Sequence, residues 1–270
     1  MSGQPTDLMD YGFQEPQTPY VSPSQSARVW TEAWVIREMY CPACGETALR
    51  DLPNNSPVAD LDCEACREQY ELKATKAAFR RKVVDGAYST MIARLESETA
   101  PSLMLLRYNK QARAVRDVEV IPKEFFVPSI IERRKTLGPN ARRAGWTGCN
   151  ILLDRIPSIG RIPVIQDQTT RSVEDVTRQW KATGFVSMTT RTVAAKGWLL
   201  DVLRCVERIG RRDFTLADVY RFEDDLGTLY PNNRNVRPKI RQQLQVLRDA
   251  GAVSFEGGGQ YRLMITGQLD

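Results

Sequence analysis

Two Cys-x-x-Cys pairs constrain this 270-residue chain more than any other feature of its sequence. Cys41 and Cys44 form the first pair, and Cys63 and Cys66 form the second. Each short turn directs two thiolates at one tetrahedral ion, so the spacing predicts a structural Zn²⁺ site with four sulfur ligands. Gly45 follows the first pair and supplies the backbone freedom that such a turn needs.

Two disulfides or a redox-active pair are the alternative interpretations of these cysteines. The N-terminal residues show no basic-then-apolar signal pattern, so we expect a cytoplasmic chain, in which structural disulfides are rare. An ion with four cysteine ligands has no open position, and we therefore expect it not to be the catalyst. Cys149 and Cys205 stand alone and are expected to be small core residues.

The chain contains no histidine, which excludes Ser-His-Asp and Cys-His mechanisms and every histidine-ligated metal site. Any hydrolytic chemistry must use carboxylates, lysines and metal ions. No apolar run approaches the roughly 20 residues that span a bilayer, so no membrane partner is expected. The net charge is only +5, but residues 133–143 and 234–248 each carry five cations and no acid. These segments suit a polyanion, with ordinary solvated faces as the alternative.

Three charged residues around the second cysteine pair form the pattern D-x10-E-x-K, namely Asp60, Glu71 and Lys73. In a strand, Glu71 and Lys73 share one face while Leu72 points to the other, towards a core. Two carboxylates can hold Mg²⁺ through oxygen ligands. A neighbouring lysine can orient a water and stabilise charge on an attacked phosphorus. The pattern therefore predicts phosphodiester hydrolysis without histidine.

Taken alone, this pattern is weak, because ordinary surface charges produce it often. Its position on both sides of a cysteine pair strengthens the interpretation. Asp62 competes with Asp60 because it lies two residues further on, and Glu68 is a less favoured spare.

Apolar periodicity beyond Lys73 predicts a helix over residues 77–97, with apolar residues at i, i+4, i+7 and i+11 from Val84. Apolar runs at 102–108, 114–121 and 161–166 predict three strands. Strand, helix and strand in this order indicate an α/β nuclease-like core.

Residues 136–150 combine three glycines, a proline, two arginines and a tryptophan without helix or strand periodicity. Arg142 and Arg143 are candidates to contact phosphates or base edges. Trp146 could stack on a base or wedge into a duplex, and burial of Trp146 beneath the loop is the alternative.

The C-terminal quarter shows helix, strand, helix, helix and a two-stranded wing, the order of a winged helix-turn-helix. Thr215-x-x-Asp218 is a capping arrangement at the start of the second helix. The third helix, near residues 236–250, places apolar residues inward. Its outward stripe is suited to reading a major groove, with protein contacts as the alternative, and consists of Arg237, Arg241, Gln245 and Arg248.

The chain resembles the DpnI-like family of methylation-dependent type II (IIM) restriction endonucleases. The similarity extends over residues 26–263. Six ordered blocks carry it: ARVWTEAWVIREMYCPACG, PVADLDCEACREQYELK, DGAYSTMIARL, ARRAGWTGCNI, FTLADVYRFEDDL and KIRQQLQVLRD.

This resemblance implies a PD-(D/E)xK catalytic domain with an embedded four-cysteine zinc site, followed by a C-terminal winged helix. It implies Mg²⁺ or Mn²⁺ on Asp60 and Glu71, with Lys73 as the catalytic lysine. Trp146 falls in the family's recognition loop, which favours DNA contact over burial. The substrate implied is double-stranded DNA methylated at adenine N6 in GATC. The motif's proline departs from the pattern, because Pro57 lies three residues before Asp60.

We accordingly expect an N-terminal tail over 1–25, loosely packed, a catalytic domain over 26–190 and a winged helix over 191–270. We expect a monomer with no small-molecule substrate. Two other functions remain open: an endonuclease of different specificity, and a non-catalytic zinc-ribbon and winged-helix regulator.

Overall fold

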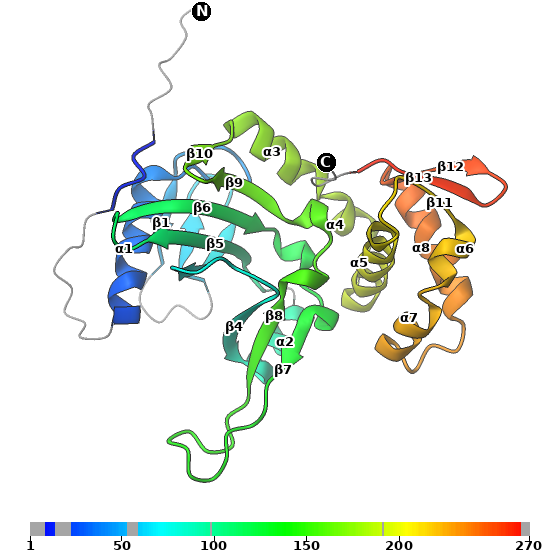
Figure 1. Cartoon of the computed structure of the whole chain (residues 1–270), viewed down its shortest axis with the longest axis horizontal. Coiled ribbons are helices and arrows are strands. Elements are labelled where there is room, and N and C mark those ends of the chain that lie inside the picture. The colour runs from blue at the N-terminus through cyan, green and yellow to red at the C-terminus, as the bar shows by residue number, and fades with distance from the viewer. Residues whose placement is uncertain (1–8, 14–22, 53–58, 98, 191, 266–270) are drawn as a thin grey trace, which may run out of the picture. The chain divides into compact units, whose positions relative to one another are not determined.

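The computed structural model describes residues 9–13, 23–52, 59–97, 99–190 and 192–265. The chain divides into two compact units (Figure 1). Unit 1 comprises residues 1–79, 101–121 and 162–181, and unit 2 comprises residues 80–100, 122–161 and 182–270. These units interleave along the sequence. The domain boundaries at 25 and 190 follow chain order and stay a prediction.

Unit 1 is built on a seven-stranded mixed sheet of order β1-β2-β3-β5-β6-β9-β10. β3 and β5 pair in parallel, whereas every other neighbouring pair in this sheet is antiparallel. The strands are β1 (Leu49–Asp51), β2 (Leu61–Cys63), β3 (Gln69–Thr75), β5 (Ser102–Asn109), β6 (Ala114–Ile121), β9 (Ile162–Gln166) and β10 (Thr169–Thr170). The three strands predicted from apolar runs correspond to β5, β6 and β9 and are confirmed.

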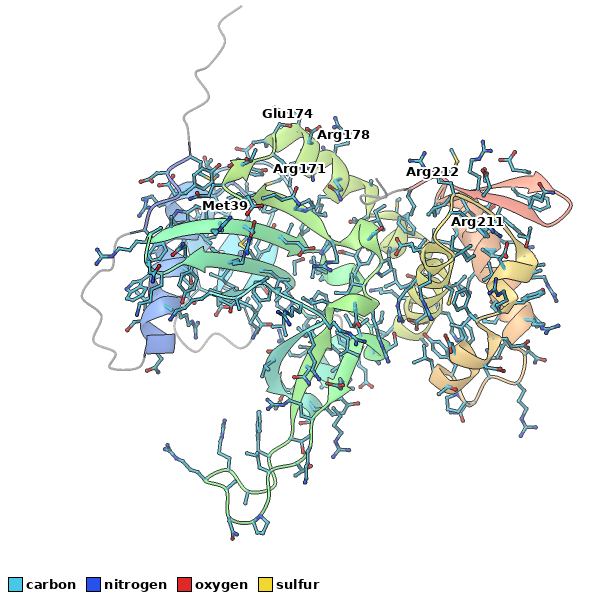
Figure 2. All side chains as sticks on the ribbon, viewed as in Figure 1. Met39, Arg171, Glu174, Arg178, Arg211 and Arg212 are labelled. Carbon is cyan, nitrogen blue, oxygen red and sulfur yellow. The ribbon has the colours of Figure 1, made fainter. Side chains whose placement is uncertain are left out.

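Two helices contribute to the core of unit 1, α1 (Pro23–Glu38) and α3 (Val173–Ala182). Trp34 and Val35 of α1 are fully buried and belong to one apolar cluster with Tyr70 and Met104 of the sheet. Figure 2 marks Met39, just after α1, which is also buried in this cluster. The core therefore fixes β3 by its apolar face and leaves its other residues to form a site.

The sequence suggested a loosely packed N-terminal tail, but residues 9–13 of this segment are packed in the structure. Phe13 is buried and contacts the ring of Tyr108 edge-on, with centroids 5.7 Å apart. Gly12 forms a β-bridge with Ala114, and the indole of Trp34 donates to the carbonyl of Asp10 at 2.9 Å. Residues 9–13 are thus part of unit 1, because burial of the Phe13 ring in the apolar core is favourable. Residues 1–8 and 14–22 lie outside the described residues.

Unit 2 holds a small antiparallel sheet of order β4-β8-β7, formed by β4 (Lys82–Ala87), β8 (Gly148–Leu152) and β7 (Ile131–Arg133). The helix predicted over residues 77–97 is wrong in its first half, because β4 precedes α2 (Tyr88–Glu96). Met91 and Leu95 are buried as the stripe predicted, but Val84 lies on β4 and is 60% exposed. Pairing of β4 with β8 satisfies its backbone and overrides the apparent helical period.

Short helical segments connect and flank this sheet. They are η1 (Lys123–Phe125), η2 (Pro128–Ile130), η3 (Leu153–Arg155), η4 (Ser158–Gly160) and α4 (Phe185–Thr189). At Gly160, an added Cβ would lie 2.4 Å from the ring of Phe125, so glycine permits the close approach of η4 to η1.

The C-terminal part of unit 2 contains a long helix, a three-stranded sheet of order β11-β13-β12 and three further helices. The elements are α5 (Val193–Arg208), β11 (Asp213–Thr215), α6 (Leu216–Tyr220), α7 (Glu223–Leu229), α8 (Val236–Asp249), β12 (Val253–Gly257) and β13 (Gln260–Leu263). The second expected helix is divided into α6 and α7; otherwise the winged-helix order is confirmed.

The predicted cap at Thr215 is a complete capping box, in which Thr215 and Asp218 exchange hydrogen bonds with each other's main-chain amide. Arg211, marked in Figure 2 at the turn before β11, donates to the same carboxylate at 2.7 Å. The amide and hydroxyl of Thr215, together with Arg211, lower the pKa of Asp218 to about 2.

In the described part of the chain, no helix combines the length and apolar character needed to cross a lipid bilayer.

Candidate functional site: a cysteine cluster beside a carboxylate and lysine face

The four paired cysteines converge in unit 1, where their sulfur atoms all lie within 4.8 Å of one another. The sulfurs of Cys41 and Cys66 are 3.7 Å apart, as are those of Cys44 and Cys63. A tetrahedral Zn²⁺ with sulfur at about 2.3 Å holds its ligands about 3.8 Å apart, so these positions fit the ion. The cluster could hold a metal ion with four sulfur ligands.

The two cysteine turns have the same main-chain hydrogen bonds. The amide of Cys41 donates to the carbonyl of Glu46, and the amide of Gly45 donates back to Cys41, both at 2.8 Å. In the second turn, Cys63 donates to Glu68 at 2.9 Å and Arg67 donates to Cys63 at 2.8 Å. Gly45 has a φ of 88°, as the sequence predicted for this turn, whereas the second turn places Arg67 at 65°.

Burial strongly raises the pKa of the Cys41 thiol above its ordinary value, because an isolated thiolate is costly in the core. A bound cation would offset this cost. Four cysteine sulfurs at this spacing could bind zinc. Cys149 and Cys205, by contrast, are buried away from this cluster, as expected for core residues.

The second cysteine turn lies at one end of the β2–β3 hairpin, and Asp60, Glu71 and Lys73 lie towards the other. Leu61 pairs with Tyr70 across the two strands; Asp60 directly precedes Leu61, and Glu71 directly follows Tyr70. Tyr70 and Leu72 are buried, whereas Glu71 and Lys73 are only partly exposed, at 18% and 25% of their side chains. The alternation predicted for β3 is confirmed.

Main-chain groups fix Asp60 in this arrangement. The amide of Asp60 donates to the carbonyl of Tyr70 at 2.9 Å, and its Oδ2 accepts from the amide of Leu72 at 2.8 Å. Glu71 Oε1 lies 2.5 Å from Lys73 Nζ. The hairpin therefore brings the Asp60 carboxylate to the main chain of β3 between Glu71 and Lys73, and these two residues share one face of the strand.

Sequence reasoning missed three charged residues next to Asp60. Arg28 of α1 binds Asp60 Oδ1 at 2.6 Å and Glu32 Oε1 at 2.5 Å. Burial, together with the charge of Asp60, raises the pKa of Glu32 and that of Asp51. The signal available in the sequence was the i,i+4 spacing of Arg28 and Glu32, which is common on solvated helices and therefore indicates little.

Asp62 and Glu68, the two spare carboxylates, have partners of their own. Asp62 is 3% exposed and accepts two hydrogen bonds from Arg50, at 2.7 and 3.1 Å. Glu68 accepts from the hydroxyl of Ser102 at 2.7 Å. Asp60 is thus the aspartate of the hairpin whose carboxylate contacts the main chain of β3 next to Glu71. Pro57, the proline of the motif, lies outside the described residues.

In unit 2, the segment with Arg142, Arg143 and Trp146 is the outer part of a hairpin between β7 and β8, rather than an irregular loop (Figure 1). Main-chain hydrogen bonds continue beyond the strands, from Leu137 to the carbonyl of Trp146 at 2.9 Å and from Gly145 to that of Leu137 at 3.0 Å. We call residues 134–147 the finger.

Trp146 is half-buried in the finger. Its ring passes so close to Gly148 that an added Cβ would lie 2.7 Å from its Cη2 atom. The Arg143 guanidinium lies 5.5 Å from the ring centroid, in a cation–π contact. Arg142 and Arg143 are exposed. The finger thus presents one aromatic ring with cations around it.

The outward face of α8 carries the predicted residues Arg237, Arg241 and Gln245, all exposed, while the inward Ile240, Leu244 and Leu247 are fully buried. Arg237 binds Glu223 of α7 at 2.6 Å, and Arg241 donates to the hydroxyl of Tyr220 at 2.7 Å. The finger and α8 belong to unit 2, whereas the carboxylates and Lys73 belong to unit 1.

Comparison with known protein families covers nearly all of the described chain. A family model described as DpnI, Dam-replacing family, matches residues 9–189. A second, described as DpnI_C, Dam-replacing HTH domain, matches residues 194–263. The first match alone spans more than half of the chain, and the second coincides with the winged helix. The chain belongs to the DpnI (Dam-replacing) family.

Proposed function

We propose that this protein is a Mg²⁺-dependent restriction endonuclease that cuts double-stranded DNA at GATC sites methylated on adenine N6. Family membership implies a methylation-dependent restriction endonuclease, and the helix-turn-helix match implies DNA binding. The observation that carries the finer proposal is the contact of the Asp60 carboxylate with the main chain of β3 between Glu71 and Lys73, which form an ion pair. We assign this hairpin and its neighbours to a PD-(D/E)xK core acting as a monomer.

Asp60 and Glu71 would hold the catalytic Mg²⁺, or Mn²⁺ in its place. Hard cations of this kind prefer carboxylate oxygens, and both residues offer them at a partly exposed face. Around Asp60, Glu32 and Asp51 add two further acids, and Arg28 adds one cation. When bound, the ion supplies polarisation of the scissile phosphate.

Lys73 would be the residue of the protein that acts directly on the attacking water and the phosphate. Its ammonium group can orient a water for in-line attack and stabilise the charge that develops on the phosphate oxygens. Glu71 holds Lys73 by the 2.5 Å contact, which keeps the ammonium near the carboxylate face before substrate binds. A 5′-phosphate and a 3′-hydroxyl are the expected products.

The four cysteines would hold a structural Zn²⁺, separate from the catalytic ion. Its position at one end of the β2–β3 hairpin supports a role in holding the segment between Asp60 and Glu71. Zinc and magnesium thus have different tasks in one hairpin.

Trp146 is our candidate for the residue that senses the methyl group, with Arg142 and Arg143 on the DNA backbone. Arg237, Arg241 and Gln245 would read a groove from α8. Burial of one methyl group contributes only about 0.8 kcal/mol. So small a gain favours reading the methyl group twice, once by the finger and once by the winged helix.

Cleavage of matched duplexes tests this proposal directly. Two oligonucleotide duplexes that differ only in adenine methylation of one GATC site are incubated with the protein and Mg²⁺. We expect strand cleavage of the methylated duplex and none without Mg²⁺. Equal cutting of both duplexes would favour an endonuclease of other specificity. Binding without any cleavage, unchanged in Asp60→Ala and Lys73→Ala, would favour a non-catalytic regulator.

A further inference from the structure

The buried tyrosine before the catalytic glutamate contacts the cysteine cluster. The Tyr70 side chain is fully buried, and its hydroxyl oxygen lies 3.0 Å from the sulfur of Cys41. Its ring packs edge-on against Trp180 of α3, with centroids 6.1 Å apart. The Tyr70 side chain therefore extends from strand β3 to the cluster, and Glu71, the next residue, lies on the opposite face of the strand.

The direction of this hydrogen bond follows from the chemistry of the two groups. A metal-bound cysteine is a thiolate, which can only accept. A phenol carries its proton at neutral pH and can donate it in a hydrogen bond. Tyr70 is consequently the donor.

The contact distinguishes Cys41 from its counterpart in the second turn. The sulfur of Cys41 accepts from the main-chain amides of Ala43 and Cys44 and also from the Tyr70 hydroxyl. The sulfur of Cys63 accepts from the corresponding amides of Ala65 and Cys66 but, among the described residues, from no hydroxyl. The hydrogen bond from the Tyr70 hydroxyl is therefore additional to the main-chain hydrogen bonds that the two cysteine turns share.

We propose that Tyr70 is a positioning residue that connects the zinc site to the catalytic strand through its hydrogen bond to the Cys41 thiolate. This inference rests on the zinc assignment in the proposed function. Groups that donate to metal ligands orient them and tune the metal, and their loss costs about 10- to 100-fold in metal affinity. Tyr70 has this role for Cys41.

The main chain of Tyr70 transmits the same constraint to the carboxylates. Its carbonyl accepts from the amide of Asp60 at 2.9 Å, and the residues on either side of its pairing with Leu61 are Asp60 and Glu71. A displacement of Tyr70 would therefore move both carboxylates. One side chain thus links zinc ligation to the spacing of the magnesium ligands.

The variant Tyr70→Phe tests the proposal because it keeps the ring against Trp180 and removes only the hydroxyl. The full-length, zinc-loaded protein is mixed with an excess of a colorimetric chelator, and zinc release is followed with time. We expect release from Tyr70→Phe to be about 10-fold faster than from the unmodified protein. Tyr40→Phe is the matched control, because Tyr40 is buried next to Cys41 but its hydroxyl contacts the carbonyl of Arg171 at 3.4 Å. Its release rate should not change.

A spectroscopic readout separates hydrogen bonding from packing. In Co²⁺-substituted protein, a hydrogen bond to sulfur stabilises the thiolate electrons and raises the energy of the sulfur-to-cobalt charge-transfer band. The band of Tyr70→Phe should shift to longer wavelength, and that of Tyr40→Phe should not. Incorporation of 3-fluorotyrosine, a stronger donor, should shift it to shorter wavelength without any substitution.

Identical bands and identical release rates in Tyr70→Phe and the unmodified protein would overturn the role of Tyr70 while leaving the zinc site intact. Failure of the unmodified protein to bind Co²⁺ or Zn²⁺ through four thiolates would instead overturn the zinc assignment itself. If Tyr70→Phe does not fold, the fluorotyrosine shift decides, and its absence would overturn the proposal.

Discussion

In the β2–β3 hairpin a main-chain amide holds the carboxylate of Asp60, whereas on helix α8 the arginines Arg237 and Arg241 are held by partly exposed side chains. Asp60 accepts from the amide of Leu72, and its own amide is bound to Tyr70 in the core. Arg241 contacts only the hydroxyl of Tyr220 among the partners seen for it, and Arg237 contacts Glu223. The hairpin is preorganised, while the arginines of α8 are free to exchange partners.

This difference suits the two tasks proposed for them. Groups that stabilise a transition state must be held in place before the reaction, because reorganisation would cost part of their effect. Groups that bind DNA can adapt their side chains to phosphates or base edges at small cost. Substitutions should therefore have large, all-or-none effects in the hairpin and graded effects in the finger and α8.

Removal of zinc should have the largest effect. Since the cluster holds one end of the hairpin, stripped protein should lose cleavage altogether, and added Mg²⁺ should not restore it. The measurement is cleavage of the methylated duplex by protein whose zinc content has been verified as zero, before and after Zn²⁺ is returned. Full cutting with Mg²⁺ alone would show that the cluster does not support the carboxylates.

Lys73→Ala should lower the cleavage rate by about 10²- to 10³-fold, because a fixed cation near the reacting phosphate is lost. Duplex binding, measured by fluorescence anisotropy, should change little. Lys76→Ala is the matched control, since Lys76 follows β3 and is exposed. Equal losses in the two variants would mean that the hairpin acts only through its overall charge.

Arg241→Ala should weaken binding of the specific duplex by about 1–3 kcal/mol if this side chain reads a base edge. Titrations at several salt concentrations separate two roles. Arg241→Lys, which keeps the charge but not the forked geometry, should restore the salt dependence without the specificity. Full recovery by lysine would assign Arg241 to a phosphate instead.

Trp146→Ala should reduce the preference for methylated DNA by roughly fourfold, the equivalent of one buried methyl group at about 0.8 kcal/mol. Gly148→Ala should have a similar effect, since its Cβ would lie 2.7 Å from the Trp146 ring. Gly138→Ala on the same finger meets no atom within 4 Å and is the control. The ratio of cleavage rates on methylated and unmethylated duplexes is the measurement, and an unchanged ratio in Trp146→Ala would remove the finger from methyl sensing.

The smallest expected effect is a change in the pH dependence of stability, and it concerns a buried carboxylate of the winged helix. Asp201 of α5 is 3% exposed and accepts from Tyr230 at 2.6 Å and Ser129 at 3.2 Å. Burial raises its pKa above the ordinary value of 3.8, so the folded state holds the proton more tightly than the unfolded chain. Its contribution to stability is full below pH 3.8 and is lost as the pH rises through the folded pKa.

Asp201→Asn removes this titration, so its free energy of unfolding should fall less between pH 4 and pH 7 than that of the unmodified protein. Urea unfolding at several pH values is the measurement. Glu207, also on α5 and bound to Ser158, has a raised pKa for the same reason and remains in both proteins. Parallel curves for the two proteins would contradict the effect assigned to Asp201.

Local patterns predicted much of the fold and of the site. The alternation along β3, the capping box at Thr215 and the buried face of α8 all follow from side-chain period and short-range hydrogen bonds. The helix expected over 77–97 failed in its first half because Val84 belongs to a strand whose partner lies over 60 residues away, at Asn150. The periodicity of nearby residues in the sequence cannot indicate a strand pairing over this distance.

The sequence by itself determined the two cysteine turns and the alternation that puts Glu71 and Lys73 on one face of β3, because each depends on spacing within a single turn or strand. The tertiary structure decided which residues surround them. Arg28 reaches Asp60 from another element, and Tyr70 reaches Cys41 across 29 positions of the chain. Such contacts leave no periodic signal, since they arise only when separate elements pack on a common core.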